Sequence, residues 1–517
     1  MDPNMGVPQP TIRPLRLLKF PDEILMKISG HVRGWTPDEK YFPNDTPTGI
    51  TNIKNLRMTC RRLCSTSSHL LMHSIDAEVN IASLSQLDRI SRHQGIRKGI
   101  REVRVLLHYY DSVIADSFHV FVRHFIKEFG QEVGRIGRLP SQNNIHRSTT
   151  RSTPWNTLLD QVGQAKGILA VCRGVLNGVS ADQNNQEDMR IRTIPRKAHG
   201  EYQHRYAEQH ALIEKGTFVL AIAAAIARMP VARRLEIRDD DGPQWFNRLR
   251  SMDSLDYSNE SLTQRLLLPH RWEDAVSHQL GVPPAQLVLR LPIAIHTAGV
   301  LLTHLNIWTT PLKNYDSLAV SQEELCALKP SVQRLKEFSF VCREERYFPE
   351  IRPDSRDVNA LKQYLLSILD TSSVKHIRLD LDFTWDAETR PTYSLGTICT
   401  FRTWPKLACC FLGGLPLNQS DLQRFADRVP ATAQIVSLSS PFLLEGSWSE
   451  VLEALRATTT KYWRIENPWG AECESMSQEN MKLIFGTSNG DRKSLANQFV
   501  QGTMDQNPFV RLRRQDS

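Results

Sequence analysis

Two hydrophobic stripes near the amino terminus predict a small group of helices. Their apolar positions, which recur at helical spacing, are Ile24, Leu25, Ile28 and Val32 in the first stripe and Ile53, Leu56, Cys60 and Leu63 in the second. Pro21 suits a first helical turn, because its missing N–H would have no partner there, and Asp22 and Glu23 place negative charge at the positive end of the helix dipole. A helix is therefore predicted to begin at about Pro21. A unit of roughly 40 to 60 residues buries too little surface to be comfortably stable alone, so these helices need a partner surface or the rest of the chain.

Beyond these helices, helical stripes alternate with short strand-like patterns. Residues 84–91 carry leucine and isoleucine at helical spacing, and residues 100–107 alternate as a strand does. Residues 114–129 predict an amphipathic helix whose aromatic face we interpret as core rather than as a base-stacking platform. The alanine-rich run 218–227 is interpreted as a buried helix that ends before Pro230.

One spacing, L-x-x-L-x-L, recurs with a faint period. Its members are Ile100, Val103 and Val105; Ala232, Leu235 and Ile237; Leu302, Leu305 and Ile307; Leu335, Phe338 and Phe340; Val374, Ile377 and Leu379; and, more weakly, Leu407, Cys410 and Leu412. The centres at 305, 338, 377 and 410 are 33, 39 and 33 residues apart. Alternate residues of such strands face inward under a helix, and no unit hides its apolar side without the next unit stacked on it. The sequence therefore predicts stacked helix-strand repeats with a parallel sheet lining a curved solenoid.

The same alternation continues to residue 470. Helical faces at 422–429 and 448–455 flank a strand at 435–438, and residues 462–465 are predicted to cap the stack. Beyond Gly470 the composition turns polar. We therefore predict a helical motif over 17–76, a repeat domain over 77–470 and a flexible tail over 471–517.

Other polar segments are predicted to lie outside the packed repeats. Residues 1–16 are rich in proline and are predicted to be disordered. Residues 33–50, between the two N-terminal stripes, are predicted to form a loop. Residues 130–154 and 180–200 are rich in Asn, Gln, Ser, Thr and charge, so they are predicted to be surface loops or disordered insertions.

The amino-acid composition indicates the cellular compartment more clearly than it indicates the function. The chain of 517 residues has 64 Lys and Arg against 56 Asp and Glu, and this mild excess does not demand nucleic-acid binding. Nine cysteines, an odd number without paired C-x-x-C spacing, argue for a reducing compartment and against a disulfide framework or a zinc site. The sequence starts without a signal-peptide pattern, and its longest apolar run is well short of the roughly 20 residues that span a bilayer. We therefore expect a cytoplasmic or nuclear protein with neither nucleic acid nor membrane as a partner.

No motif predicts catalysis or a cofactor. The sequence lacks the glycine-rich nucleotide-binding motifs, the G-x-S-x-G elbow and the H-E-x-x-H zinc motif. The steps of five and six residues between His199, His204 and His210 do not share one helix face, so we interpret them as a solvated polar segment rather than as a metal site. The chain is therefore not predicted to be an enzyme, and no metal or cofactor residues are assigned.

Two acidic groups lie next to predicted strands. Asp239, Asp240 and Asp241 are interpreted as a solvated strand exit rather than as a cation-binding turn. Asp380 and Asp382 alternate with apolar residues, which places them on the open side of the sheet. There they could contact a partner or simply be hydrated.

The N-terminal stripes resemble the F-box of ubiquitin-ligase substrate adaptors. The resemblance rests on an apolar residue before Pro, a following Glu-Ile-Leu with a further Ile and Val at helical spacing, and the run Leu-Arg-x-x-Cys-Arg-Arg-Leu. Phe20 stands where the family usually has Leu, and the loop at 33–50 is an insertion. In that family the motif docks on a Skp-type adaptor, which in turn holds a cullin and a RING protein. The resemblance implies that the docking or motif-core residues are Phe20, Pro21, Ile24, Leu25, Ile28, Val32, Ile53, Leu56, Cys60 and Leu63.

The repeats resemble leucine-rich repeats. Thr310, Arg343 and Asp382 stand near the place of the family's asparagine ladder residue, and the periods are longer and irregular. A generic parallel α/β arrangement remains an alternative. The predicted fold class is α/β, with a short N-terminal helical F-box-like motif followed by an irregular leucine-rich-repeat-like α/β solenoid.

Two functions from different classes remain open. In the first, the chain is a non-catalytic adaptor that links an unknown protein substrate to a Skp–cullin–RING ubiquitin ligase through its F-box-like motif. In the second, it is a leucine-rich-repeat-like scaffold that is not coupled to ubiquitination, and its N-terminal helices only cap the solenoid.

Overall fold

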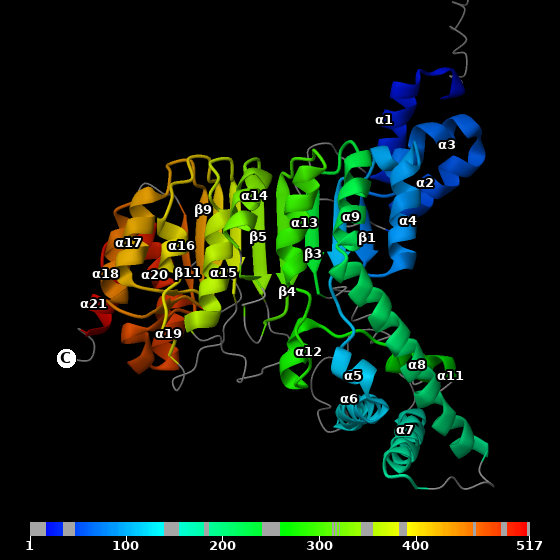
Figure 1. Ribbon diagram of the computed structural model, residues 1–517. Coiled ribbons are helices and arrows are strands. Elements are labelled where there is room, and N and C mark those ends of the chain that lie inside the picture. Colours follow the sequence, from blue (N-terminus) through cyan, green and yellow to red (C-terminus); the bar gives the residue numbers. More distant parts are fainter. Residues whose placement is uncertain are drawn as a thin grey trace, which may run out of the picture.

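A nine-stranded parallel sheet organises the computed structural model of the chain (Figure 1). The structure describes residues 17–34, 47–138, 155–179, 186–239, 259–312, 315, 318–319, 321–342, 355–381, 390–458, 462–486 and 494–513. The strands of the sheet are β1 (Ser74–Glu78), β2 (Glu102–Leu106), β3 (Arg234–Arg238), β4 (His304–Thr309), β5 (Glu337–Cys342), β6 (His376–Asp380), β7 (Cys409–Gly413), β9 (Ile435–Ser439) and β11 (Trp463–Glu466). They stand side by side in chain order. The predicted α/β class with a parallel sheet is confirmed.

The predicted period corresponds to lateral register between the strands. Leu305, Phe338, Ile377 and Cys410, the four predicted centres, are successive Cα partners on β4 to β7. The row continues into β9 and β11 at positions 436 and 463, which are 26 and 27 residues further on. The L-x-x-L-x-L spacing therefore marks one equivalent position in each strand, and the shorter C-terminal period extends it.

One layer of helices covers one face of the sheet (Figure 1). Its members are α4 (Ile81–Arg92), α9 (Thr217–Arg228), α13 (Gln286–Thr297), α14 (Gln322–Val332), α15 (Ser355–Ile368), α16 (Gly396–Thr400), α17 (Gln419–Arg428) and α18 (Trp448–Arg456). Each helix contacts the next, because each crossover between neighbouring parallel strands returns on the same side. The main hydrophobic core lies between this layer and the inward residues of the strands.

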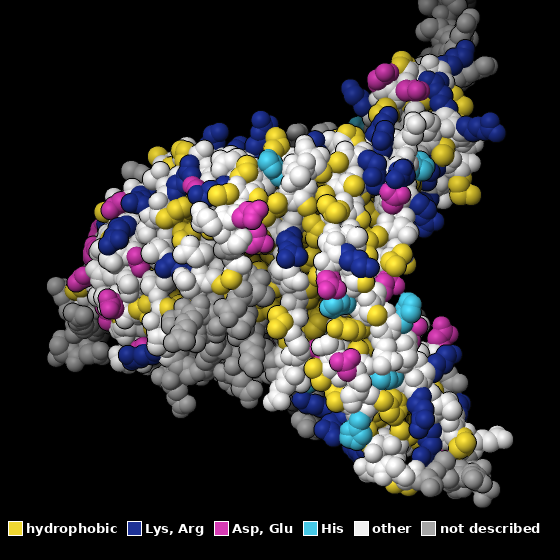
Figure 2. Space-filling view, viewed as in Figure 1, with side chains coloured by type: hydrophobic (Ala, Val, Ile, Leu, Met, Phe, Trp, Pro, Cys, Tyr) yellow, Lys and Arg dark blue, Asp and Glu magenta, His cyan; other side chains and the backbone are white. Residues whose placement is uncertain are grey.

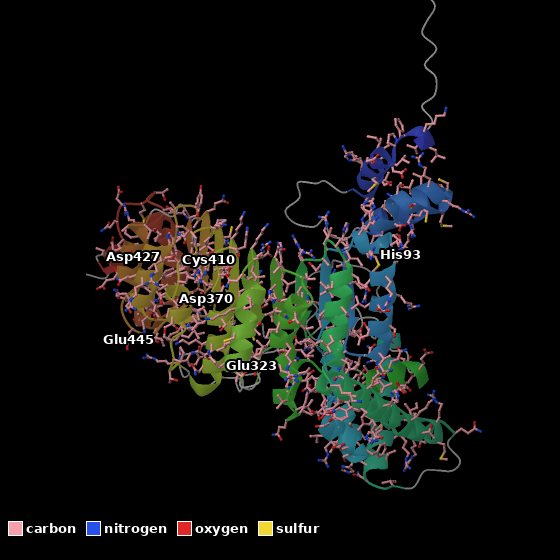
Figure 3. The ribbon with its side chains drawn as sticks, turned by 45° about the horizontal axis from the view of Figure 1, so that its top comes forward. His93, Glu323, Asp370, Cys410, Asp427 and Glu445 are labelled. Carbon is pink, nitrogen blue, oxygen red and sulfur yellow. The ribbon has the colours of Figure 1, made fainter. Side chains whose placement is uncertain are left out.

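Polar contacts tie successive repeats together. Asp370, labelled in Figure 3, follows α15 and accepts a hydrogen bond from Arg402, which follows α16. Its carboxylate also lies 3.5 Å from the Nζ of Lys329 on α14. One side chain thus links three neighbouring units at the end of the helix layer.

The alanine-rich helix α9 belongs to the core, as predicted. Phe218, Ile222 and Ile226 on it are buried. No single helix among the described residues is long and apolar enough to cross a membrane. Only α9 taken together with Asp188–Glu214 reaches that length and hydrophobicity, and the two are bent by 69° relative to each other.

The last three repeats are the most regular. Each continues into one strand of a small parallel sheet, made of β8 (Pro416–Leu417), β10 (Phe442–Leu443) and β12 (Trp469–Gly470). Gly414, Ser440 and Asn467 stand at the same place in the three turns and have positive φ values of 63°, 48° and 45°. The three turns therefore share one left-handed geometry.

The C-terminal segment closes the stack and is not a flexible tail. Its elements are η6 (Ala471–Ser475), α19 (Gln478–Phe485), α20 (Leu495–Val500) and α21 (Pro508–Arg513). Phe485, Phe499 and Phe509 are buried, and Phe485 packs edge-on against Trp448. The prediction of a tail from residue 471 is wrong for these residues, because a few aromatic side chains in a polar segment are enough to anchor it. Residues 462–465, predicted to cap the stack, belong mostly to its last strand.

A helical subdomain interrupts the repeat between β2 and β3. It contains α5 (Ser112–Asp116), α6 (Phe118–Arg138), α7 (Trp155–Leu176) and α8 (Gln186–Glu214), and α11 (Asn259–Leu266) joins it from the connection between β3 and β4. These helices share a second hydrophobic cluster, separate from the main one. The predicted helix at 114–129 is thus two helices, with a break at Ser117.

Two predictions of loops or disorder are wrong within this subdomain. Residues 130–138 continue α6, and residues 186–200 begin α8. The polar composition of α8 conceals a buried stripe that includes Ile191, Ile194 and Tyr202. Several predictions concern positions outside the described residues. These positions are most of the N-terminal loop, residues 1–16, 139–154 and 180–185, and Asp240, Asp241, Arg343 and Asp382.

Candidate functional site

The N-terminal segment folds as a three-helix unit. Helices α1 (Asp22–Arg33), α2 (Pro47–Thr59) and α3 (Arg61–Ser67) contact one another, and Leu25, Ile53 and Leu63 are buried within the unit, outside the main hydrophobic cluster. The 3₁₀ helix η2 (Ser68–Leu70) leads from it into β1. Figure 3 shows the unit projecting from the edge where the strands begin. Its surface is therefore accessible on several sides.

The ten residues predicted to dock or to form the motif core divide by exposure. Leu25, Ile53 and Leu63 are buried; Phe20, Ile28, Leu56 and Cys60 are half-buried; Pro21, Ile24 and Val32 are exposed. Ile24, Ile28 and Val32 follow one another at intervals of four residues, so they line one side of α1. Ile24 and Val32 are each 38% exposed. The structure thus separates an inner stripe that holds the unit together from an outer stripe that a partner can reach.

Arg62 holds the beginning of α1 in place. Its guanidinium donates to the Asp22 carboxylate at 2.9 and 2.8 Å and to the Phe20 carbonyl oxygen at 2.8 Å. A further hydrogen bond goes to the carbonyl of Leu18. One of the two arginines of the Cys-Arg-Arg-Leu run therefore positions the residues that precede the outer stripe.

Further apolar side chains are exposed on this unit. They are Leu17, Leu18, Met26 and Met58, none of which the sequence analysis singled out. Figure 2 shows Lys and Arg side chains beside hydrophobic ones over the N-terminal helices. Contiguous apolar patches mark contact surfaces, whereas singly exposed apolar side chains are ordinary. The stripe of Ile24, Ile28 and Val32 is therefore the candidate contact surface of this unit.

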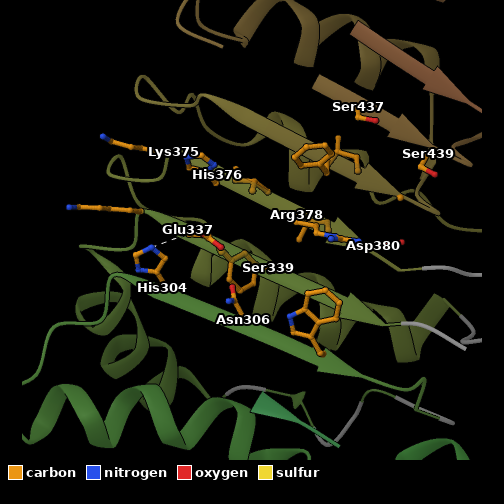
Figure 4. A pocket seen from close by; sticks show the side chains of 18 of the residues that line it. His304, Asn306, Glu337, Ser339, Lys375, His376, Arg378, Asp380, Ser437 and Ser439 are labelled. Carbon is orange, nitrogen blue, oxygen red and sulfur yellow. Dashed lines mark hydrogen bonds and ion pairs between the residues drawn. The ribbon is translucent and has the colours of Figure 1, made fainter. Parts of the chain in front are cut away.

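The open face of the main sheet forms a second candidate site. A trough of about 810 Å³ lies over strands β4 to β11 on the side away from the helices (Figure 4), and Arg234 at the start of β3 completes its lining. Its floor follows the register of the strands, because Asn306, Ser339, Arg378, Phe411 and Ser437 are successive Cα partners. Each of these residues alternates with buried neighbours along its strand. The stacking of the repeats therefore brings together side chains from five separate segments.

Two arginines lie over one tryptophan in the trough. The guanidinium carbons of Arg238 and Arg378 lie 5.5 and 5.2 Å from the ring centroid of Trp308. Arg378 also pairs with the Asp380 carboxylate at 3.2 Å, which confirms that Asp380 lies on the open side of the sheet. Cation–π contacts of this kind fix the direction of long side chains.

Three polar atoms on the trough floor have no partner in the described structure. They are Oδ1 of Asn306, Nε1 of Trp308 and Oγ of Ser339. Ser339 is only 5% exposed. A buried polar group without a hydrogen bond costs roughly 1–3 kcal/mol. These atoms are buried as well as unpartnered, so a molecule in the trough reaches them only where neighbouring side chains move aside.

Positive charge lines the edge of the trough where the strands begin. Lys336 and Lys375 immediately precede β5 and β6, and the backbone N–H of Lys375 donates to the carbonyl of Lys336 at 2.7 Å. Arg234, His304 and His376, each the first residue of its strand, line the same edge. Among the described residues neither lysine forms an ion pair. This cationic rim was not predicted. Its residues nevertheless occupy the first two variable positions of the L-x-x-L-x-L pattern.

The rim changes the chemistry of a histidine. Burial, together with the positive charges of Arg234, Lys336 and His376, lowers the pKa of the His304 imidazole to about 4. The Nε2 of His304 lies 3.6 Å from the Glu337 carboxylate. His304 is therefore neutral at neutral pH, and an added negative charge nearby would favour its protonated form.

The other polar residues that the sequence singled out have structural roles or lie exposed at the surface. Asp239 is buried and accepts hydrogen bonds from the backbone N–H groups of Trp272 and Thr310, so its interpretation as a solvated strand exit is wrong. His199 is buried against Phe121, so its interpretation as solvated is wrong too, whereas His204 and His210 are exposed. Within the described ranges, no group of three or more His, Cys, Asp or Glu side chains could hold a metal ion.

Comparison with known proteins leaves the site to be interpreted from its own geometry. No protein-family model matches the chain. No curated protein matches it either.

Proposed function

We propose that the chain is a substrate-recognition adaptor that links a target protein to a Skp–cullin–RING ubiquitin ligase through an F-box-like N-terminal unit. The observation that carries the proposal is the division of α1 into two stripes. Leu25 faces the unit's interior, while Ile24 and Val32 remain exposed although they are apolar. This arrangement supports docking on a partner without unfolding of the unit.

The repeat domain supports the other half of the proposal. Strands in chain order with one helix layer support an irregular leucine-rich-repeat-like solenoid, and its open sheet face offers the target a binding surface. Such an adaptor needs no catalytic group of its own. It would act by raising the effective concentration of the target near the charged ubiquitin carrier.

Capture of the Skp-type subunit tests the proposal. Ile24→Asp combined with Val32→Asp should abolish co-purification with that subunit, because burying two charges in an apolar interface costs at least several kcal/mol. Because each side chain is only 38% exposed, thermal melting of the variant beside the natural chain checks that loss of capture is not loss of the fold. Leu25→Asp is unsuitable, because Leu25 is buried in the unit.

Leu220→Asp is the matched control. Leu220 is 64% exposed on α9, far along the chain from the N-terminal unit. This variant introduces the same charge at an exposed apolar site and should retain capture. Undiminished capture by the Ile24→Asp, Val32→Asp variant would overturn the proposal.

The second candidate is a scaffold whose N-terminal helices only cap the solenoid. One observation favours it: a Cβ atom on Gly99 would lie 1.6 Å from the carbonyl oxygen of His69, so the joint between the unit and the sheet is tight. Removal of residues 1–66 leaves β1 intact and separates the two functions. An adaptor's repeat domain should keep its melting temperature, whereas a capped solenoid should lose several degrees or unfold.

A further inference from the structure

We infer that the trough over β4 to β11 binds an acidic peptide segment of the target protein, with its carboxylates at the cationic rim and its backbone over the polar floor. The inference deepens the proposed function, since it names the class of target segment. It depends on the proposed function only because it describes the bound protein as the target of a ubiquitin ligase.

The charge of the trough is positive on balance. Its lining has five Lys and Arg residues against three carboxylates: Arg234, Lys336, Lys375, Arg378 and Arg464 against Glu337, Asp380 and Glu466. Asp380 pairs with Arg378 and Glu466 with Arg464, while Glu337 faces His304, which is neutral at neutral pH. Lys336 and Lys375 form no ion pair among the described residues, so a complementary ligand is negative.

Lys336 and Lys375 also lie close to each other. They occupy equivalent places immediately before neighbouring strands, and such strands lie about 4.8 Å apart. Figure 4 shows the Lys375 side chain extending beyond the start of its strand, on the side where His304 and His376 also lie. Two flexible ammonium groups at this spacing can reach one carboxylate together or two carboxylates of an extended chain.

The carboxylates of the trough favour a peptide over a nucleic acid. Glu337, Asp380 and Glu466 all line it. A nucleic-acid strand carries a phosphate at every nucleotide and would meet these negative charges along its length, whereas a peptide can place its carboxylates at the rim alone. Phe411 on the floor is 43% exposed and offers a ring face to a base, so an oligonucleotide is the competing occupant in the test.

Fluorescence anisotropy with the purified full chain tests the inference. The probe is a short fluorescein-labelled peptide of alternating Glu and Ser, compared with a Gln and Ser peptide of the same length. We expect the Glu peptide to bind and the Gln peptide to bind at least about tenfold more weakly, because the rim contributes through charge. Its affinity should also fall as the salt concentration rises.

Charge reversal locates the site. Lys336→Glu with Lys375→Glu should weaken binding of the Glu peptide by about tenfold or more. The matched control, Lys215→Glu with Lys482→Glu, makes the same change of net charge at two exposed lysines outside the trough and should leave binding within about twofold.

Several outcomes would overturn the inference. These are no binding of the Glu peptide, equal binding of the Gln peptide, equal losses in the two charge-reversed variants, or tighter binding of a single-stranded oligonucleotide at the trough. The assay contains no ligase subunit. A chain that fails to capture the Skp-type subunit but binds the peptide therefore removes the adaptor function alone, and the reverse result removes only this inference.

Discussion

The guanidinium of Arg62 on α3 donates two hydrogen bonds, of 2.9 and 2.8 Å, to the carboxylate of Asp22 in the first turn of α1. This contact joins two parts of the N-terminal unit that the sequence separates by 40 residues. Both side chains are largely exposed, so the contact orients α1 more than it stabilises the unit.

Arg62→Ala should therefore loosen the start of α1 at a small cost in stability. We expect a loss of about 0.5–1 kcal/mol for an exposed ion pair with additional backbone contacts. Hydrogen exchange of the α1 amides should become faster, while the strands of the main sheet keep their protection. Arg61→Ala is the control, because Arg61 forms no ion pair among the described residues. Equal exchange in the two variants would contradict this role of Arg62.

Gly470→Ala should destabilise the C-terminal repeats severely. Gly470 has a φ of 78°, and a Cβ atom there would lie 2.1 Å from the carbonyl oxygen of Leu443. The backbone would have to move in addition to the strain of φ 78° with ψ 172°, a conformation that essentially only glycine adopts and that costs other residues about 1–3 kcal/mol. Gly502→Ala is the comparison at another glycine of positive φ, 74°, where nothing lies within 4 Å of the added atom. Urea unfolding should show a clearly larger loss for Gly470→Ala than for Gly502→Ala.

Glu472 should make the last repeats sensitive to acid. Its carboxylate accepts hydrogen bonds from the Ser447 hydroxyl and from the backbone N–H groups of Trp448 and Ser449, at the start of α18. Burial acts to raise its pKa, but these hydrogen bonds outweigh burial and lower the pKa below the ordinary value of 4.5. The stabilisation is therefore present above about pH 4.5 and is lost as the pH falls through the lowered pKa.

Glu472→Gln tests this linkage. At neutral pH the variant should be less stable by about 1 kcal/mol, the typical contribution of a helix cap. The difference between the two chains should shrink in unfolding experiments below about pH 4. Glu479→Gln, at an exposed position of α19, should show no such convergence. A difference that stays constant with pH would contradict the role of the Glu472 charge.

His304 should couple acidic-peptide binding to proton uptake. Its pKa of about 4 reflects burial and the surrounding Arg234, Lys336 and His376, and Glu337 faces it at 3.6 Å. A carboxylate brought to the rim favours protonated His304 and raises its pKa in the complex above about 4. Affinity should therefore rise as the pH falls through that higher pKa and level off near pH 4, where the imidazole of the free chain is protonated as well.

His304→Gln should flatten this pH dependence. The glutamine keeps a polar side chain but cannot take up a proton in this range. Calorimetry in buffers of different ionisation enthalpy measures the protons taken up on binding. Equal proton uptake by the variant and the natural chain would show that another group carries the effect.

The repeat was readable from the sequence because inward positions of stacked strands leave a spacing signal. Phe338 and Ile377 are 39 residues apart along the chain and are lateral partners in the sheet. The L-x-x-L-x-L pattern records this relation, since the apolar positions of each strand must meet the same core. The open face leaves no comparable signal, because its residues are not constrained to be apolar.

The helices that were missed share a physical cause. Helix α8 buries Ile194 and Tyr202 within an otherwise polar composition, and the C-terminal segment is held by widely spaced phenylalanines. Composition averages over such sparse anchors, and tertiary packing decides whether they form a helix. The contact of Arg238 and Arg378 with Trp308 could not be predicted for another reason. Such a prediction needs the order in which the strands lie side by side, in addition to their positions in the sequence.

The order of the strands also bears on how the chain folds. Strands β7, β9 and β11 pair across intervals of 26 and 27 residues, whereas β2 and β3 pair only after the whole segment from α5 to α9 has been enclosed between them. Short closures form faster than long ones, because less chain entropy is lost before contacts form. Synthesis from the amino terminus delivers the slow pairing first and the fast repeats last. The N-terminal unit therefore leaves the ribosome well before the sheet that adjoins it is complete.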